Sequence, residues 1–235
     1  MAAAIYKEQT LPSILITGAN RGIGRTLCES YLADGWRVFA TSRNSLCDVP
    51  SGAEHIVLEV ADPLSIQQMA ETLQGVDLDI IWNNAGVYLD RDIDTAQLDE
   101  QTWLKTFAIN TIAPIKIAQA LTNNLGASTR KVLAFTTSKM GSLHANGSGS
   151  FAYRSSKSAL NMAVRSLAHD LQSQRISCLA LHPGHVRTDM GGENGDIDTA
   201  TSVKGMRNVI DAVDSGQYPE FNSRYLNYDG TTIQW

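Results

Sequence analysis

The fold is decided by residues 13–24, which read SILITGANRGIG. An apolar run over 13–17 leads directly into glycines spaced G-x-x-x-G-x-G, and apolar residues then recur at helical spacing until Asp34-Gly35 ends the helix. Glycine permits a tight turn and lets main-chain N–H groups and the positive end of the helix dipole approach a pyrophosphate closely. The stretch therefore predicts a strand, a turn and a helix that bind a dinucleotide.

Downstream, short apolar runs alternate with longer segments of helical period. This alternation is typical of repeated βαβ units, so we predict an α/β fold, a doubly wound (Rossmann) and mostly parallel sheet with helices on both faces. The predicted strands are 13–17, 36–41, 55–60, 79–83, 131–136 and 175–181. Besides the helix after the glycines, we predict helices over 62–75, 99–125 and 151–172.

Length and composition narrow the class of protein. The 235 residues contain no linker rich in Pro or Ser and no internal repeat, so we predict a single domain over 1–235. Lys and Arg number 19 against 24 Asp and Glu, and this net charge of −5 offers no basic field for a nucleic acid. Nucleic acid is therefore not an expected partner.

Cysteine usage and hydropathy predict a cytoplasmic location. Cys28, Cys47 and Cys178 stand far apart and form neither a disulfide framework nor a Cys-x-x-Cys pair, which favours a reducing compartment. Residues 1–8 lack the apolar stretch of a signal peptide, and no later window has the ~18 consecutive apolar residues of a membrane span. We therefore expect no membrane partner. No metal site is expected either, because His182-Pro183-Gly184-His185 lacks metal-ligand spacing.

The end of the second predicted strand indicates the type of dinucleotide. Folds that bind NAD usually have Asp or Glu there, about 20 residues after the glycines, to bond the ribose hydroxyls. This chain has Thr41-Ser42-Arg43 instead. An acid would repel a 2′-phosphate, whereas Arg43 and Arg21 together would bracket one, so NADP(H) is favoured over NAD(H). The alternative is that both arginines are solvated surface charges.

Tyr153 and Lys157 form a candidate catalytic pair. They are four residues apart in a predicted helix, which places their Cβ atoms about 5–6 Å apart on one face. A phenol has a pKa of about 10 and needs a nearby cation to favour its phenolate for acid/base work near neutral pH. Taken alone, the same spacing also fits an ordinary surface pair.

Taken together, the motifs resemble the short-chain dehydrogenase/reductase family in order and spacing over residues 13–190. The shared motifs are TGANRGIG at 17–24, NNAG at 83–86, Asn110, Ser138, Tyr153 with Lys157, and Pro183-Gly184. Within the family the chain looks most like the small carbonyl reductases of the C-factor and sniffer type, because of the Ser-rich loop before Tyr153 and Tyr228-Asp229-Gly230.

The resemblance implies a role for four residues. Tyr153 matches the general acid/base, and Ser138 matches the serine that hydrogen-bonds the same carbonyl oxygen. Lys157 matches the lysine that holds the nicotinamide ribose and lowers the pKa of the tyrosine, and Asn110 matches the asparagine that supports a proton-relaying water beside that lysine. Ser138 precedes Tyr153 by 15 residues, slightly more than is common, so Ser142 or Thr137 remains an alternative partner.

The resemblance also implies cofactor contacts. Glu59-Val60 departs from the usual Asp-Val after the third strand, which leaves the adenine contact open. The implied cofactor-binding residues are Gly18, Asn20, Arg21, Gly22, Ile23, Gly24, Arg43, Glu59, Val60, Asn84, Ala85, Gly86, Tyr153, Lys157, Pro183, Gly184, Val186 and Thr188.

The expected function is that of an NADP(H)-dependent oxidoreductase that interconverts a carbonyl and an alcohol on a small molecule by hydride transfer. The alternative is a nucleotide-binding sensor or signalling protein that keeps the fold without turnover as its main role. The substrate pocket is expected to include a loop over about 187–206, and family resemblance implies a homodimer or homotetramer formed through the two long helices.

Overall fold

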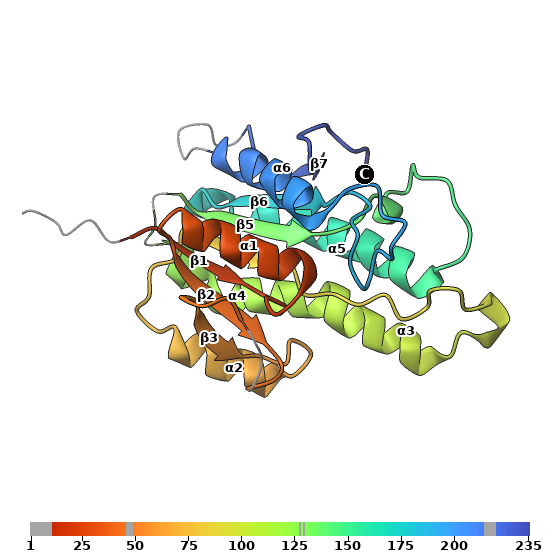
Figure 1. Ribbon diagram of the computed structural model, residues 1–235, viewed down its shortest axis with the longest axis horizontal. Helices are drawn as coiled ribbons and strands as arrows, with labels where there is room; N and C mark the ends of the chain where they lie inside the picture. Colours follow the sequence, from red (N-terminus) through yellow and green to blue (C-terminus); the bar gives the residue numbers. More distant parts are fainter. Residues whose placement is uncertain (1–10, 46–48, 127, 129, 214–219) are drawn as a thin grey trace, which may run out of the picture.

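Seven parallel strands form one sheet in the order β3-β2-β1-β4-β5-β6-β7 (Figure 1). The computed structural model describes residues 11–45, 49–126, 128, 130–213 and 220–235. All six predicted strands are present, with ends shifted by at most three residues. The strands are β1 (Ser13–Ile16), β2 (Arg37–Ser42), β3 (Glu54–Val57), β4 (Ile80–Asn83), β5 (Val132–Thr136), β6 (Ser177–His182) and β7 (Arg224–Asn227).

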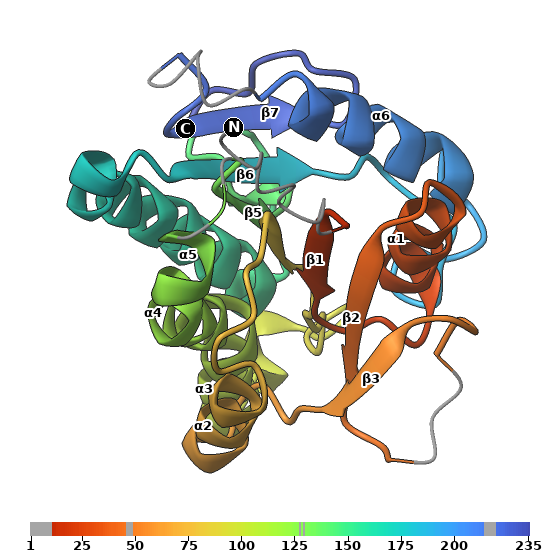
Figure 2. The ribbon, with the colours of Figure 1, turned by 90° about the vertical axis from the view of Figure 1, so that its left-hand side faces the viewer.

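Helices cover both faces of the sheet (Figure 2). On one face lie α1 (Gly22–Ala33) and α6 (Thr199–Asp211). On the other lie α2 (Pro63–Thr72), α4 (Ala113–Gly126) and α5 (Phe151–Asp170), and α3 (Glu100–Phe107) packs against α5. The predicted doubly wound α/β fold is confirmed.

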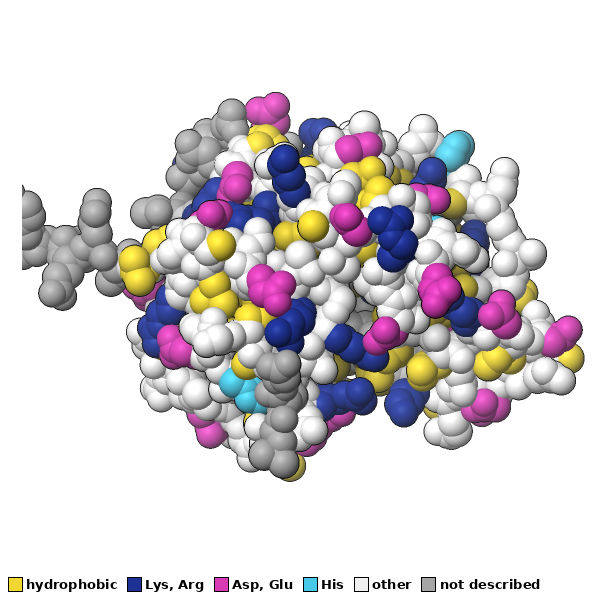
Figure 3. Space-filling model, in the orientation of Figure 1, with side chains coloured by type: hydrophobic (Ala, Val, Ile, Leu, Met, Phe, Trp, Pro, Cys, Tyr) yellow, Lys and Arg dark blue, Asp and Glu magenta, His cyan; other side chains and the backbone are white. Residues whose placement is uncertain are grey.

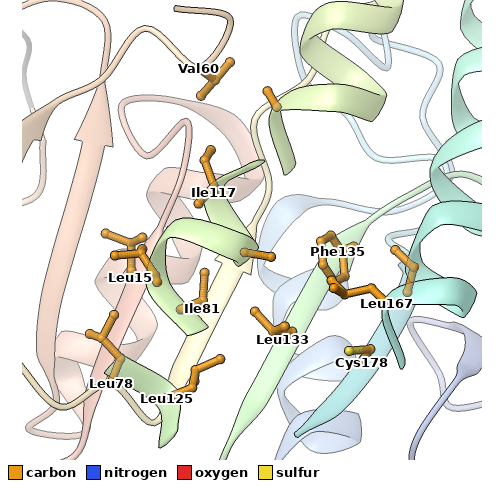
Figure 4. Close-up of a cluster of buried hydrophobic side chains, with 14 of the residues drawn as sticks. Leu15, Val60, Leu78, Ile81, Ile117, Leu125, Leu133, Phe135, Leu167 and Cys178 are labelled. Carbon is orange, nitrogen blue, oxygen red and sulfur yellow. The ribbon is translucent and has the colours of Figure 1, made fainter. Parts of the chain in front are cut away.

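The core consists of two layers, one on each face. Alternate strand residues contribute to each: Leu15 and Ile81 pack in the layer with α2, α4 and α5, whereas Ile14 and Ile80 pack with α1 and α6. Figure 4 shows Leu15 and Ile81 near Ile117 and Leu125 of α4. Because both faces are covered, the central strands β1, β4, β5 and β6 consist mostly of buried apolar residues, as buried parallel strands do. Trp82, fully buried in β4, occupies the second layer.

Two elements near the C-terminus were missed by the sequence prediction. Helix α6 begins at Thr199, where the Asp198 carboxylate accepts a hydrogen bond from the Thr201 N–H at 2.7 Å. The prediction of a loop over 187–206 is therefore wrong after Asp198, because the remaining residues of that segment belong to α6. Strand β7 reads Arg-Tyr-Leu-Asn, so its apolar part is only two residues long and its sequence carries little strand signal of its own.

The predicted helix over 99–125 runs without a break from Glu100 to Gly126, but its hydrogen bonding changes in the middle. A π-helical turn at Ala108–Ile112 separates α3 from α4 and contains the buried Asn110. Such turns insert an extra residue into a helix, often at functional sites, and apolar periodicity does not reveal them.

The remaining sequence expectations concern location and metal binding. Cys28 and Cys178 are free and buried, whereas Cys47 and residues 1–8 lie outside the described residues. In the part of the chain that the structure describes, no helix combines the length and hydropathy needed to cross a membrane. Among those same residues, no three His, Cys, Asp or Glu side chains gather in an arrangement that would hold a metal ion. Basic and acidic side chains are interspersed over the face shown in Figure 3.

Candidate active site

The glycine loop between β1 and α1 packs directly against the end of β4. Gly18 has φ of +67°, and a Cβ on Gly24 would lie 2.1 Å from the Gly18 carbonyl oxygen, so neither position accepts a side chain without a shift of the main chain. The Thr17 hydroxyl accepts hydrogen bonds from the N–H groups of Asn84 and Ala85, each at 3.0 Å. The expected cofactor segments therefore meet where the strand order reverses, between β1 and β4.

The N-terminus of α1 carries no side-chain cap. Arg21 occupies the N-cap position in an extended conformation, and its side chain accepts no hydrogen bond there. The first N–H groups of a helix have no partner within the helix and carry partial positive charge. This end of α1, beside the glycine loop, is suited to bind a phosphate group.

The two arginines expected at a 2′-phosphate have different surroundings. Arg43 follows β2, is exposed, and forms no ion pair with any described residue. The Arg21 guanidinium instead pairs with the Asp189 carboxylate at 2.9 Å, in the loop after β6. The structure therefore does not show both arginines available for a 2′-phosphate. Arg21 could contact the phosphate only after its ion pair with Asp189 opens.

Glu59 and Val60 follow β3 and make local contacts. Val60 is 7% exposed and belongs to the core. The Glu59 carboxylate accepts a hydrogen bond from the Ala61 N–H at 3.2 Å, and the Ser65 hydroxyl accepts one from the Glu59 N–H. These contacts fix the turn into α2.

Tyr153 is buried in the first turn of α5, close to Ser138 at the end of β5. Burial raises the pKa of the Tyr153 phenol to about 12, whereas the family resemblance implies a pKa lowered by Lys157. A hydrogen bond with the Ser138 side chain lowers this pKa in part. The Tyr225 hydroxyl, from β7, donates a hydrogen bond to the Ser138 carbonyl oxygen at 2.6 Å. The structure thus brings the predicted Tyr and Ser hydroxyls together.

The two alternative hydroxyls point elsewhere. The Thr137 hydroxyl donates to the Asn161 side-chain oxygen at 2.7 Å, and the Ser142 hydroxyl donates to the Gln234 carbonyl oxygen at 2.5 Å. The geometry therefore favours Ser138 as the partner of Tyr153.

Lys157 lies one turn after Tyr153 and is 4% exposed. Its Nζ donates a hydrogen bond to the Thr136 carbonyl oxygen at 2.9 Å and lies 5.9 Å from the centre of the Tyr153 ring. Burial lowers the pKa of Lys157 to about 8. The predicted Tyr–Lys pair is therefore a buried pair and not a chance pair on the surface.

Asn110 is fully buried and holds the segment after β4. Its side-chain oxygen accepts from the Val87 N–H and its amide donates to the Val87 carbonyl, both at 2.8 Å. A Cβ on Gly86 would lie 3.2 Å from the Asn110 oxygen and 3.5 Å from the Lys157 Nζ, so Gly86 separates these two groups. Asn110 and Lys157 thus flank the same glycine.

Three residues after the NNAG motif belong to the site and were not predicted. The Tyr88 ring stacks on the Tyr153 ring with centroids 4.2 Å apart, and the Arg91 guanidinium lies 4.8 Å from the centre of the Tyr88 ring. Buried Asp90 accepts hydrogen bonds from main-chain N–H groups at the start of α5. No spacing rule links 88–91 to Tyr153, since the contacts arise only on folding.

The segment from Pro183 to Thr188 forms the opposite wall. The Ser202 hydroxyl donates to the Pro183 carbonyl oxygen at 2.6 Å, which ties this wall to α6. Between the walls is a cavity of about 400 Å³ whose lining includes Ile23, Ser138 and Tyr153. The cavity thus joins the glycine loop to the candidate catalytic hydroxyls.

The glycine loop and the buried Tyr, Ser and Lys at the carboxyl edge of the sheet place this chain in the class of dinucleotide-binding α/β proteins. Residues 12–198 match the short chain dehydrogenase family, and the chain belongs to that family.

The comparisons also identify similar proteins. The chain is 40% identical to C-signal of Myxococcus xanthus over 163 residues, which cover 67% of this chain and 93% of that protein. Among solved structures, carbonyl reductase Sniffer of D. melanogaster is 31% identical with a TM-score of 0.87. The match covers 96% of this chain and 100% of the Sniffer chain. NADPH-bound carbonyl reductase from chicken fatty liver is 30% identical with a TM-score of 0.84. The match covers 96% of this chain and 99% of the chicken chain. The predicted resemblance to the C-factor and sniffer type is confirmed, and the predicted cofactor is the one bound in the chicken structure.

Proposed function

We propose that this protein is an NADP(H)-dependent carbonyl reductase that interconverts an aldehyde or ketone and the corresponding alcohol. The observation that carries the proposal is the buried group of Tyr153, Ser138 and Lys157 beside the glycine loop. The chain's family and its similarity to carbonyl reductases support the same reaction.

Tyr153 is the proposed proton donor in reduction. Burial keeps its phenol protonated at neutral pH, which is the form that gives a proton to a carbonyl oxygen. Ser138 donates a hydrogen bond to the same oxygen as negative charge develops on it. The Lys157 ammonium, held on the Thr136 carbonyl, then stabilises the tyrosinate. In the oxidation of an alcohol the same groups act in reverse.

The cofactor fits the residues present. The uncapped N-terminus of α1 and the glycine loop would hold the diphosphate. Arg43 would hold the 2′-phosphate, and Lys157 would hold the nicotinamide ribose. NADPH supplies the hydride when it is bound. Tyr88 and Met190, at the cavity, would help exclude water from the reacting carbon.

The experiment is a spectrophotometric NADPH-oxidation screen over neutral aromatic aldehydes and diketones, with Tyr153→Phe as the matched variant. We expect wild-type turnover and a loss of about 10³-fold or more in kcat for the variant, because the proton donor is removed while the ring stack with Tyr88 stays. Calorimetry should show unchanged NADPH binding. Cofactor binding without turnover of any carbonyl would instead support a sensor that keeps the fold.

We also propose that the protein is a homodimer or homotetramer assembled through α3, α4 and α5. Apolar side chains are exposed on this side, among them Trp103 (38%), Leu104 (55%) and Met162 (62%). Contiguous exposed apolar groups favour association. Light scattering on the wild type and on Leu104→Glu tests this assignment, and a monomeric wild type would contradict it.

A further inference from the structure

The cavity beside Tyr153 is lined by cations. Arg91, Lys139 and Arg154 contribute to its wall, and no Asp or Glu of the described residues does. The chain as a whole has a net charge of −5, so this wall is opposite in sign to the whole protein. Clustering of one charge in a cleft concentrates ligands of the other charge.

Among the residues that the structure describes, these three charges have no anionic partner. Arg154 donates to the Ala145 carbonyl oxygen at 2.9 Å and Arg91 to the Met190 carbonyl oxygen, but a carbonyl carries no net charge. No ion pair joins Arg91, Lys139 or Arg154 to a carboxylate in the part of the chain described. Arginines away from the cavity do form such pairs: Arg25 with Glu29, Arg37 with Glu54, Arg130 with Asp211 and Arg207 with Asp34.

Nearby ionisable groups do not cancel the positive charge. Asp189 lies between the lining residues Thr188 and Met190, but its carboxylate pairs with Arg21. Asp90 is 1% exposed, and both its oxygens accept N–H groups of α5, so its carboxylate does not line the cavity. His185, at the rim, lies 3.7 Å from Asp196. His182 is largely buried and stays neutral at pH 7, since burial lowers its pKa to about 4. The charge at the wall therefore comes from two guanidiniums and one ammonium.

The cations adjoin the groups proposed to bind the carbonyl. Lys139 directly follows Ser138, and Arg154 directly follows Tyr153. Arg91 lies over the Tyr88 ring, which stacks on Tyr153. The expected cofactor segments, Ile23 and residues 183–186 with Thr188, line the same cavity. None of the three cations belongs to the expected cofactor-binding residues, so we assign them to the substrate.

We propose that the preferred substrate is an oxo acid, an aldehyde or ketone that also carries a carboxylate, with the carbonyl on Tyr153 and Ser138 and the carboxylate on Arg154, Lys139 and Arg91. This inference rests on the proposed reductase function and specifies its substrate class. In the reaction the carbonyl carbon gains a hydride from NADPH, its oxygen gains a proton from Tyr153, NADPH is oxidised to NADP⁺, and the carboxylate is unchanged. Arginine suits this task because its planar fork matches a carboxylate.

The test compares 4-formylbenzoate with its methyl ester at saturating NADPH, because the two differ in charge but share the same aldehyde. We expect kcat/KM to be about tenfold or more higher for the carboxylate, the value of one charge-assisted hydrogen bond. This preference should weaken from 20 mM to about 300 mM salt, since partly exposed charges are screened. Arg154→Gln and Lys139→Gln should each reduce the carboxylate-to-ester ratio about threefold to tenfold.

The control is Lys204→Gln, which removes an exposed charge on α6 outside the cavity and should leave the ratio unchanged. Turnover of ester and carboxylate with equal kcat/KM would overturn the inference while the reductase function stands. Binding supplies a readout independent of turnover: calorimetry with NADP⁺, which cannot reduce an aldehyde, should show tighter binding of 4-formylbenzoate than of its methyl ester, and a difference that shrinks in Arg154→Gln. Equal affinities would overturn the inference. Absence of turnover with every carbonyl would count against the proposed reductase function itself.

Discussion

The Asp90 carboxylate accepts a hydrogen bond from the main-chain N–H of Tyr153 at 3.2 Å and another from Ala152 at 2.8 Å. Ser150, at the N-cap of α5, provides no side-chain cap and has a left-handed conformation. Asp90 therefore supplies from 62 residues away the cap that the helix lacks locally. It fixes the turn of α5 that carries the proposed proton donor.

Replacing Asp90 should misplace Tyr153. Asp90→Ala leaves two buried N–H groups unpaired, and we expect a loss of about 2–3 kcal/mol in the free energy of unfolding. Because the reacting geometry depends on the first turn of α5, kcat should fall at least tenfold while the KM for NADPH stays close to the wild-type value. Urea unfolding and steady-state kinetics measure the two effects. Asp92→Asn, which changes an exposed carboxylate in the same segment, is the control, and equal behaviour of the two variants would contradict this role.

The buried Lys157 should set an upper pH limit for cofactor capture. Its pKa is about 8 in the folded chain, so the ammonium that would hold the ribose is lost as the pH rises through 8. We expect kcat/KM for NADPH, which reports the free enzyme, to fall above about pH 8. In Lys157→Arg the side chain stays charged, and the fall near pH 8 should disappear even if the rate is lower. An identical profile in both proteins would contradict the assignment.

The same burial should make Lys157 costly for stability. The unfolded chain keeps the proton of Lys157 up to about pH 10.5 and the folded chain only up to about pH 8, so the unfolded state binds more protons between these values. Below pH 8 the full penalty is present, and it diminishes as the pH rises to 10.5. This lowering of the pKa reduces the free energy of unfolding by about 3 kcal/mol at neutral pH. A variant without the amine would regain this amount but lose about 1 kcal/mol with the hydrogen bond to Thr136. Lys157→Met should therefore be about 2 kcal/mol more stable at pH 7, by calorimetry, and this advantage should vanish near pH 10.5.

Arg43 should determine the choice between NADPH and NADH. Arg43→Asp places a negative charge where the 2′-phosphate is expected, so the NADPH-to-NADH ratio of kcat/KM should fall about 100-fold. Lys204→Asp makes the same change of charge far from the site and should leave the ratio as it is. An unaltered ratio in Arg43→Asp would rule out this residue as the phosphate contact.

The ion pair between Arg21 and Asp189 should compete with NADPH. Both side chains are largely exposed, so opening the pair costs about 0.2–1 kcal/mol. Asp189→Asn frees Arg21 for the cofactor and should lower the Kd for NADPH about twofold to fivefold, measured by fluorescence titration. Asp196→Asn, in the same loop and opposite His185, is the matched control. A weaker NADPH complex in Asp189→Asn would show that the pair supports the site.

The sequence predicts those parts of the molecule whose determinants are local. The glycine loop, strands β1 to β6 and the Tyr153–Lys157 pair each depend on residues a few positions apart, and all are found where expected. Asp90, Tyr88 and Arg91 could not be predicted, because their contacts with α5 and with Met190 exist only after distant segments pack. Helix α6 does carry a local signal, because Asp198 precedes residues with apolar helical spacing.

The hydrogen bonds that Tyr225 and Gln234 make to the loop at Ser138 and Ser142 have a consequence for biosynthesis. Their partners are 87 and 92 residues earlier in the chain. During vectorial synthesis the ribosome releases β1 to β6, with all four predicted catalytic residues, before these supports exist. A nascent chain therefore passes through a stage in which the nucleotide-binding sheet has emerged but the serine loop is still unsupported, and the candidate active site is completed only after Tyr225 and Gln234 have been added.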